Sequence, residues 1–236
     1  MKEKIVGIIG GMGPEATVDF MKRLIRLTPA ADDIDHIHSI VDNNPKIPSR
    51  IKAIIDGVGE SPLPHIINIA RRLESFGADF LVLPCNTAHY YYPALQDSVH
   101  IPVLNMIELT VNTIIQHHPL IRKVGLLASD AIRITGIYET CLQKYGLSAV
   151  YPQLHEQKRL MQVIKDVKAG KTDESVRKVL EEVVADITAG GAEVIIIACT
   201  ELSIIADDTY VLPVIDAAEV LAERAVAVVK YGAETF

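Results

Sequence analysis

The chain has 236 residues, enough for one large domain or two small ones with a well-buried core. A net charge of −7, the absence of Trp and an aromatic content of 5% argue against nucleic acid as a partner. No apolar run reaches the roughly 18 residues of a membrane span, and the N-terminus lacks the long apolar region of a secretory signal, so we expect a cytoplasmic protein with no membrane partner. The three cysteines fit neither a disulfide framework nor a metal site.

Short apolar runs alternate with longer amphipathic segments, which predicts a doubly wound α/β architecture with parallel strands buried on both faces. In chain order the pattern predicts a strand over Ile5–Ile9, a helix opened by Pro14, a strand ending before Asp42, a helix over Pro62–Phe76, a strand over Phe80–Leu83, a helix over Asn105–His117, a strand over Val124–Leu127, helices over Ala131–Tyr145 and Ser175–Ala189, a strand over Val194–Ala198 and a helix over Ala217–Tyr231.

An internal repeat divides this pattern into two halves. The segments Gly77–Thr87 and Gly191–Glu201 both read Gly-Ala, an acid, an apolar strand, a small residue or Pro, and then Cys at the same distance from the Gly. Two similar α/β halves from a duplication are the simplest account. We expect an N-terminal half over residues 1–105, a C-terminal half over 106–216, and a helix at 217–236 that packs back onto the first half.

Both repeat cysteines, Cys85 and Cys199, end an apolar strand, where open α/β sheets bind ligands. We expect the N-terminus of a following helix to lower the pKa of each thiol. Racemisation needs one acid/base group on each face of a planar carbanion, and two facing thiols from duplicated halves meet that need. Two buried structural cysteines, or a redox disulfide between them, are the alternatives. Cys141 has no repeat partner and is interpreted as packing.

Polar residues beside the cysteines are candidates for substrate binding. Asn86 and Thr87 follow Cys85, and Thr200 and Glu201 follow Cys199. They can hold an ammonium or a carboxylate, or simply cap a helix. The histidines 89, 117 and 118 are expected to be structural or capping residues.

A glycine-rich loop, Gly10–Pro14, follows the first strand. The glycines at 11 and 13, with Ala16, match a dinucleotide fingerprint, but Pro14 removes an amide donor and Asp42 lies too far along the chain. An anion nest that holds a substrate carboxylate at the helix N-terminus is the better interpretation.

Three cations are candidates for a carboxylate clamp. Arg50 ends the stiff segment Asp42–Arg50 and can bind a carboxylate in bidentate fashion, unless it is only a solvated loop charge. Lys165 and Lys168 lie on or just after the helix before Gly170, and either can supply a second cation.

Four motifs together resemble the aspartate/glutamate racemase superfamily, most closely its aspartate racemase branch, over about residues 4 to 230: Ile8–Thr17, Asp42–Arg50, Pro84–His89 and Ala198–Leu202. The resemblance implies two Rossmann-like halves with the active site at their interface, an amino-acid substrate, no pyridoxal phosphate or other cofactor, no metal, and a homodimer. It implies that Cys85 and Cys199 are catalytic. It also implies substrate contacts by Gly11, Met12, Gly13, Arg50, Asn86, Thr87, Lys168, Thr200 and Glu201.

One segment departs from this family pattern. Ala131-Ile132 replaces the usual Gly-Thr pair, so a hydroxyl is lost, and we expect an apolar side chain to narrow the site and change the choice of amino acid. The prediction is a cofactor-independent racemase of aspartate or glutamate. The alternatives are an isomerase or decarboxylase of a related acid such as maleate, a non-catalytic binding protein for a small acid, and a dinucleotide-dependent oxidoreductase.

Overall fold

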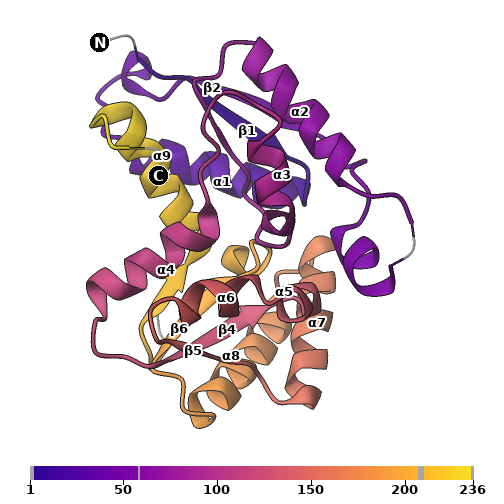
Figure 1. Cartoon of the computed structure of the whole chain (residues 1–236). Coiled ribbons are helices and arrows are strands. Elements are labelled where there is room, and N and C mark those ends of the chain that lie inside the picture. Colours follow the sequence, from indigo (N-terminus) through magenta and orange to yellow (C-terminus); the bar gives the residue numbers. More distant parts are fainter. Residues whose placement is uncertain (1–2, 58, 207–209, 235–236) are drawn as a thin grey trace.

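The computed structural model describes residues 3–57, 59–206 and 210–234 (Figure 1). Residues 1–2 and 58 of the predicted N-terminal half, 207–209 of the predicted C-terminal half and 235–236 of the predicted last helix therefore lie outside the described residues. The described strands are β1 (Val6–Gly10), β2 (Ser39–Asn43), β3 (Phe80–Val82), β4 (Lys123–Ala128), β5 (Ser148–Val150), β6 (Val194–Ala198) and β7 (Val214–Asp216).

The helices alternate with these strands, as the apolar spacing predicts. The described α-helices are α1 (Pro14–Leu27), α2 (Leu63–Ser75), α3 (Tyr92–Gln96), α4 (Met106–His117), α5 (Asp130–Thr135), α6 (Ile137–Gln143), α7 (Leu154–Lys168), α8 (Glu174–Ala189) and α9 (Ala217–Lys230). Short helical turns are η1 (Asp33–Asp35), η2 (Lys52–Asp56), η3 (Thr87–Tyr91) and η4 (Leu202–Ile204). In the part of the chain that the structure describes, no helix combines the length and the apolar character that crossing a bilayer requires.

Two parallel sheets confirm the predicted α/β class. The first has the order β2-β1-β3, and the second has the order β5-β4-β6-β7. β1 and β4 occupy equivalent central places, since β1 pairs with β2 and β3, and β4 pairs with β5 and β6. The repeat is not complete. In the second sheet β6 pairs with the strand β7, whereas at the equivalent place in the first sheet β3 has only a single bridge, between Leu81 and Val103.

Local chemistry explains where the elements differ from the predicted ranges. The helix expected over Ala131–Tyr145 is broken into α5 and α6 at Gly136, whose φ of 63° is left-handed and ends a helix. Asp42 is part of β2 rather than the residue after it. β3 ends at Val82, two residues before Pro84, which has no N–H to extend the ladder.

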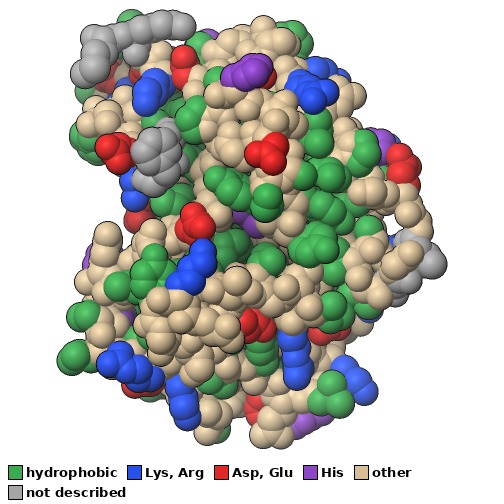
Figure 2. All heavy atoms as spheres, viewed as in Figure 1, with side chains coloured by type: hydrophobic (Ala, Val, Ile, Leu, Met, Phe, Trp, Pro, Cys, Tyr) green, Lys and Arg blue, Asp and Glu red, His purple; other side chains and the backbone are tan. Residues whose placement is uncertain are grey.

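The last helix packs against the first half of the chain. α9 lies beside α1 and α4 (Figure 1), and its apolar face joins β1, β3 and α1 in one core. Ala222 and Ala225 are fully buried there with Phe20 and Phe80. On the face shown in Figure 2, hydrophobic side chains gather across the middle, where the two halves meet. The chain therefore crosses between the halves twice, at α4 and between β7 and α9.

Candidate active site

Cys85 and Cys199 lie just beyond the carboxyl ends of β3 and β6, the strands that carry the repeat. Both thiols are buried, with 7% and 8% of each residue exposed, and both are free, as is Cys141. In this structure the two repeat cysteines therefore do not form the disulfide that was one alternative. Each is followed only by a short 3-10 turn, η3 or η4, and not by a long helix.

The glycine loop between β1 and α1 approaches other backbone closely. Gly11 has a φ of 92°, and a Cβ there would lie 2.1 Å from the carbonyl oxygen of Asn44. The Gly11 N–H donates to Thr17 Oγ1 at 2.9 Å, so one amide of the expected anion nest is already used. The Met12 side chain is 3% exposed and packs in the same apolar cluster as Cys85. The Met12 side chain is therefore part of the hydrophobic core.

A cavity of about 270 Å³ opens between the glycine loop, the loop after β2, the end of α7 and the turn after β6. Its lining combines apolar side chains with two cations and two acids: Gly11, Gly13, Pro14, Glu15, Ala16, Pro45, Ile47, Ser49, Arg50, Val167, Lys168, Glu201 and Ile204. Of the residues predicted to bind substrate, Gly11, Gly13, Arg50, Lys168 and Glu201 are brought together here.

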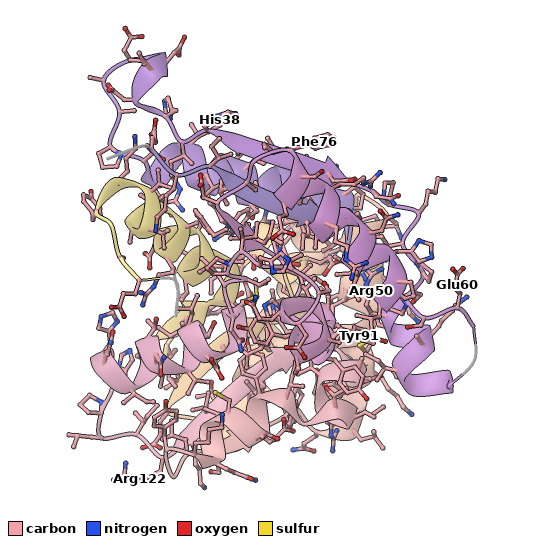
Figure 3. The ribbon with its side chains drawn as sticks, turned by 45° about the horizontal axis from the view of Figure 1, so that its top comes forward. His38, Arg50, Glu60, Phe76, Tyr91 and Arg122 are labelled. Atoms are coloured by element: carbon pink, nitrogen blue, oxygen red, sulfur yellow. The ribbon has the colours of Figure 1, made fainter. Side chains whose placement is uncertain are left out.

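Arg50 enters this cavity from the first half. Figure 3 shows it close to Tyr91, and the Arg50 charge opposes the rise that burial causes in the pKa of the Tyr91 hydroxyl. Arg50 Nη1 donates to the carbonyl of Pro48 at 3.1 Å, which fixes the guanidinium on its own loop. Its buried Nε has no hydrogen-bond partner among the described residues. A buried N–H without a partner is costly, so this donor suits an anion that binds in the cavity.

Lys168 enters the cavity from the second half, in the last turn of α7. Burial acts to lower its pKa, but the charges of Glu201, Cys199 and Cys85 outweigh burial and Arg50, so the pKa of Lys168 is raised. Both thiols are thus within electrostatic range of one ammonium group. Lys165, the other candidate, is exposed on the same helix and does not line the cavity.

Cys199 and Glu201 form a buried pair. The Cys199 thiol donates to Glu201 Oε2 at 3.1 Å, and Lys168 Nζ lies 3.4 Å from the other carboxylate oxygen, Oε1. That contact is an ion pair without hydrogen-bond geometry, and Oε1 accepts no hydrogen bond among the described residues. Burial first, and then Glu201, raise the pKa of Cys199 well above its ordinary value, against the opposing charge of Lys168. The prediction that a helix N-terminus lowers the pKa of this thiol is therefore wrong. Burial and the neighbouring carboxylate raise the pKa, and the short 3-10 turn that follows Cys199 does not offset them.

The residues after Cys85 bind the other half instead of capping a helix. Asn86 Oδ1 accepts a hydrogen bond from the Tyr138 hydroxyl at 2.6 Å, and Thr87 Oγ1 lies 3.1 Å from Ser129 Oγ. Asn86 makes no side-chain cap. Thr200 is buried beside Cys199. Tyr138 and Ser129 were not found from the sequence, because each meets its partner across more than 40 residues of chain.

The departing pair Ala131-Ile132 does not reach the cavity. Both residues are fully buried, and Ile132 packs in the core of the second half with Val111 and Leu142. The expected narrowing of the site by Ile132 is therefore wrong. Ser129, from the turn before α5, places a hydroxyl against Thr87 instead.

The remaining candidates are structural. His89 is buried, with Nδ1 against the Cys85 carbonyl oxygen at 2.9 Å and Nε2 accepting from the Met106 N–H at 3.1 Å. Cys141 packs in the second core, where burial raises its pKa. His117 ends α4, and His118 is its C-terminal cap.

Comparison with known proteins decides the family. The family model described as Asp/Glu/hydantoin racemase matches residues 9–225. The chain belongs to the Asp/Glu/hydantoin racemase family. A broad-specificity amino-acid racemase, RacX of Bacillus subtilis, is 30% identical over 234 residues, which cover 94% of this chain and 97% of that protein.

Solved structures of this racemase family have the same fold. An aspartate racemase from Picrophilus torridus is 37% identical and has a TM-score of 0.84 over 95% of this chain and 93% of its own. The glutamate racemase isoform RacE1 from Bacillus anthracis, at 18% identity and a TM-score of 0.66, shares the fold over 98% of this chain and 83% of its own. The protein is an isomerase, an amino-acid racemase.

Proposed function

We propose that this racemase acts on an acidic amino acid, aspartate or glutamate, and moves the Cα proton between Cys85 and Cys199 without a cofactor. The observation that carries the proposal is the place of Lys168. Its ammonium lines one cavity with Arg50 and is within electrostatic range of both thiols. An acidic substrate carries two carboxylates, and each of them needs a cation or a set of hydrogen-bond donors. The similarity to an aspartate racemase supports the same substrate class.

Substrate recognition follows from the charges in the cavity. Arg50, with its unpartnered Nε, and Lys168 are the groups for carboxylates. Glu201 Oε1, which has no hydrogen-bond partner among the described residues, is the group for the α-ammonium. Binding would exchange the Lys168–Glu201 ion pair for two pairs with substrate, so no charge stays unpaired.

The two thiols have different resting roles in this mechanism. Cys199 rests as a thiol, because burial and Glu201 raise its pKa. Cys85 reacts as the thiolate: the Cα–H bond breaks, the proton goes to the Cys85 sulfur, and the electron pair stays on Cα. The Cys199 S–H bond then breaks, and its proton joins Cα on the opposite face. The product is the other enantiomer, with Cys85 as thiol and Cys199 as thiolate. After product release, Cys85 gives a proton to solvent and Cys199 takes one up, which restores the first state.

The test is a chiral assay of L-amino acids with purified protein and no added cofactor, repeated in deuterated water. Racemisation of aspartate or glutamate with deuterium at Cα is expected. Cys85→Ala and Cys199→Ala should each abolish racemisation while one enantiomer still exchanges its Cα proton, because the remaining thiol works on one face alone. Cys141→Ala, a buried thiol outside the site, is the control. Undiminished racemisation in either active-site variant would contradict the two-thiol mechanism.

We also propose that the protein works in the cytoplasm, as expected from the sequence, and as a homodimer, which the family resemblance implies. Sedimentation equilibrium of the purified protein should then give twice the chain mass of 25.9 kDa. A single-chain mass at micromolar concentration would contradict the dimer.

A further inference from the structure

We propose that Tyr138 is a positioning residue, which orients the side-chain amide of Asn86 so that its N–H groups bind the α-carboxylate of the substrate beside Cys85. The proposal rests on the proposed function in one respect, that the reacting Cα lies next to Cys85.

The Asn86 amide is held at one end and unpaired at the other. Its Oδ1 accepts from the Tyr138 hydroxyl at 2.6 Å, and its Nδ2 has no hydrogen-bond partner among the described residues. Asn86 is 2% exposed, so water does not readily satisfy those two N–H donors. An amide whose oxygen is fixed also has a fixed nitrogen, because the group is planar. Two buried donors directly after Cys85 in the chain suit the carboxylate that every amino acid carries.

Tyr138 is built to hold this orientation. Its ring is fully buried in the core of the second half, and burial raises the pKa of its hydroxyl, which therefore stays protonated and able to donate. The contact joins α6 of the second half to the turn after Cys85 in the first. The neighbouring Thr87–Ser129 contact, at 3.1 Å, ties the same turn to the second half a second time. Asn86 thus has little freedom to turn its amide by moving its backbone.

The test is Tyr138→Phe, assayed with the amino acid that the native protein racemises fastest. The contact with the α-carboxylate exists in both ground and transition state, so KM should rise about tenfold while kcat changes less than about twofold. The matched control is Tyr151→Phe. Tyr151 is also a tyrosine of the second half that donates to a side chain, Glu139 Oε1 at 2.7 Å, but it does not touch Asn86. The KM of the Tyr151→Phe variant should equal that of the native protein. A purely structural role for Tyr138 would lower the melting temperature or kcat and leave KM unchanged, which would overturn the proposal.

A double-mutant cycle asks whether Tyr138 acts through Asn86. Asn86→Ala removes the donors and should raise KM at least as much as Tyr138→Phe. In the Asn86→Ala background, Tyr138→Phe should then raise KM no further. Additive effects on KM would show that Tyr138 acts by another route and would overturn the proposal.

Asn86→Asp provides a second test, in which Tyr138 itself is not changed. The carboxylate still accepts from the Tyr138 hydroxyl, but it repels the substrate carboxylate, so KM should rise more than in Asn86→Ala. An unchanged KM in Asn86→Asp would overturn the proposal even if Tyr138→Phe did not fold. The outcome is separate from that of the proposed function, because a preference for neutral amino acids would contradict the proposed substrate and leave this comparison of KM intact.

Discussion

The thiol of Cys199 donates a hydrogen bond to Glu201 at 3.1 Å, and this buried contact makes the two repeat cysteines chemically unequal. The duplicated segments place a Cys at the same strand end, but the residue two positions later is Glu201 in one half and Thr87 in the other. A carboxylate next to a thiol favours the protonated sulfur, whereas a hydroxyl adds no charge. The pseudo-symmetry of the fold therefore does not extend to the charge that lies next to its thiols.

Glu201→Gln should shift the pH dependence of the two directions of racemisation. Burial first, and then Glu201, hold the pKa of Cys199 high, so removal of the Glu201 charge lowers that pKa. In the direction in which Cys199 donates the proton, activity is lost as the pH rises through the pKa of Cys199, and in the variant this loss should begin at lower pH than in the native protein. In the direction in which Cys199 accepts the proton, activity appears as the pH rises through the same pKa, so it should also appear at lower pH in the variant. The pH profile of kcat/KM, measured from each enantiomer, shows both effects. Profiles that match those of the native protein would show that Glu201 does not raise the pKa of Cys199.

Lys168→Gln should discriminate between substrates. A charged group that loses its hydrogen-bonded ion pair costs about 1.5–3 kcal/mol, so KM for aspartate or glutamate should rise at least about tenfold. Amino acids with neutral side chains should lose much less. Lys165→Gln removes an exposed lysine of the same helix that does not line the cavity, and it should leave every KM native. A uniform rise for acidic and neutral substrates would place Lys168 at the α-carboxylate instead of the side-chain carboxylate.

Much of the fold could be predicted from the sequence, because strands buried on both faces appear as uninterrupted apolar runs. The predicted Val194–Ala198 is the observed β6, and Pro14 opens α1 at the position where its fixed φ and missing N–H suit a helix start. Gly136 breaks the helix predicted over Ala131–Tyr145, since a left-handed glycine inside an otherwise helical pattern leaves little trace in the periodicity.

The electrostatics of the site could not be predicted in the same way. The protonation of Cys199 depends on burial and on the rotamer of Glu201, which the spacing of motifs does not encode. The partners of Asn86 and Thr87 come from the other half, and Ile132 is taken up by a core that forms only when α5 packs. These are tertiary contacts, and single-residue patterns hold no information on them.

His89→Gln should remove an acid-dependent loss of stability. Burial lowers the pKa of His89, against the opposing effect of the Cys85 carbonyl. The unfolded chain therefore binds a proton below about pH 6.5 before the folded chain does, so stability is present above that pH and is lost as the pH falls, by up to about 1.4 kcal/mol per unit. The variant loses the clamp between Cys85 and Met106 at every pH, but the difference in unfolding free energy from the native protein should shrink between pH 7.5 and pH 5.5. Denaturant unfolding at both pH values measures it, and a constant difference would contradict a neutral His89.

Arg23→Met should destabilise the fold, because Arg23 neutralises a buried acid at the junction of the halves. Its Nη1 lies 2.9 Å from Asp216 Oδ2, both side chains are largely buried, and its Nη2 donates to the Ser203 carbonyl in η4 at 3.3 Å. An uncompensated buried charge costs about 3 kcal/mol or more. Arg26→Gln is the matched control, since Arg26 is 61% exposed and its pair with Glu219 contributes less than about 1 kcal/mol.

The pH dependence of the Arg23→Met loss separates charge from packing. Burial raises the pKa of Asp216 even beside Arg23, and without Arg23 it rises further. The folded variant then keeps a proton that the unfolded chain releases above about pH 3.9, so its stability falls as the pH rises through the folded pKa. Urea unfolding should show a smaller loss at pH 4.5 than at pH 7.5. Equal losses at both values would mean that Arg23 stabilises the protein through the packing of its stem, and the ion pair would then contribute nothing.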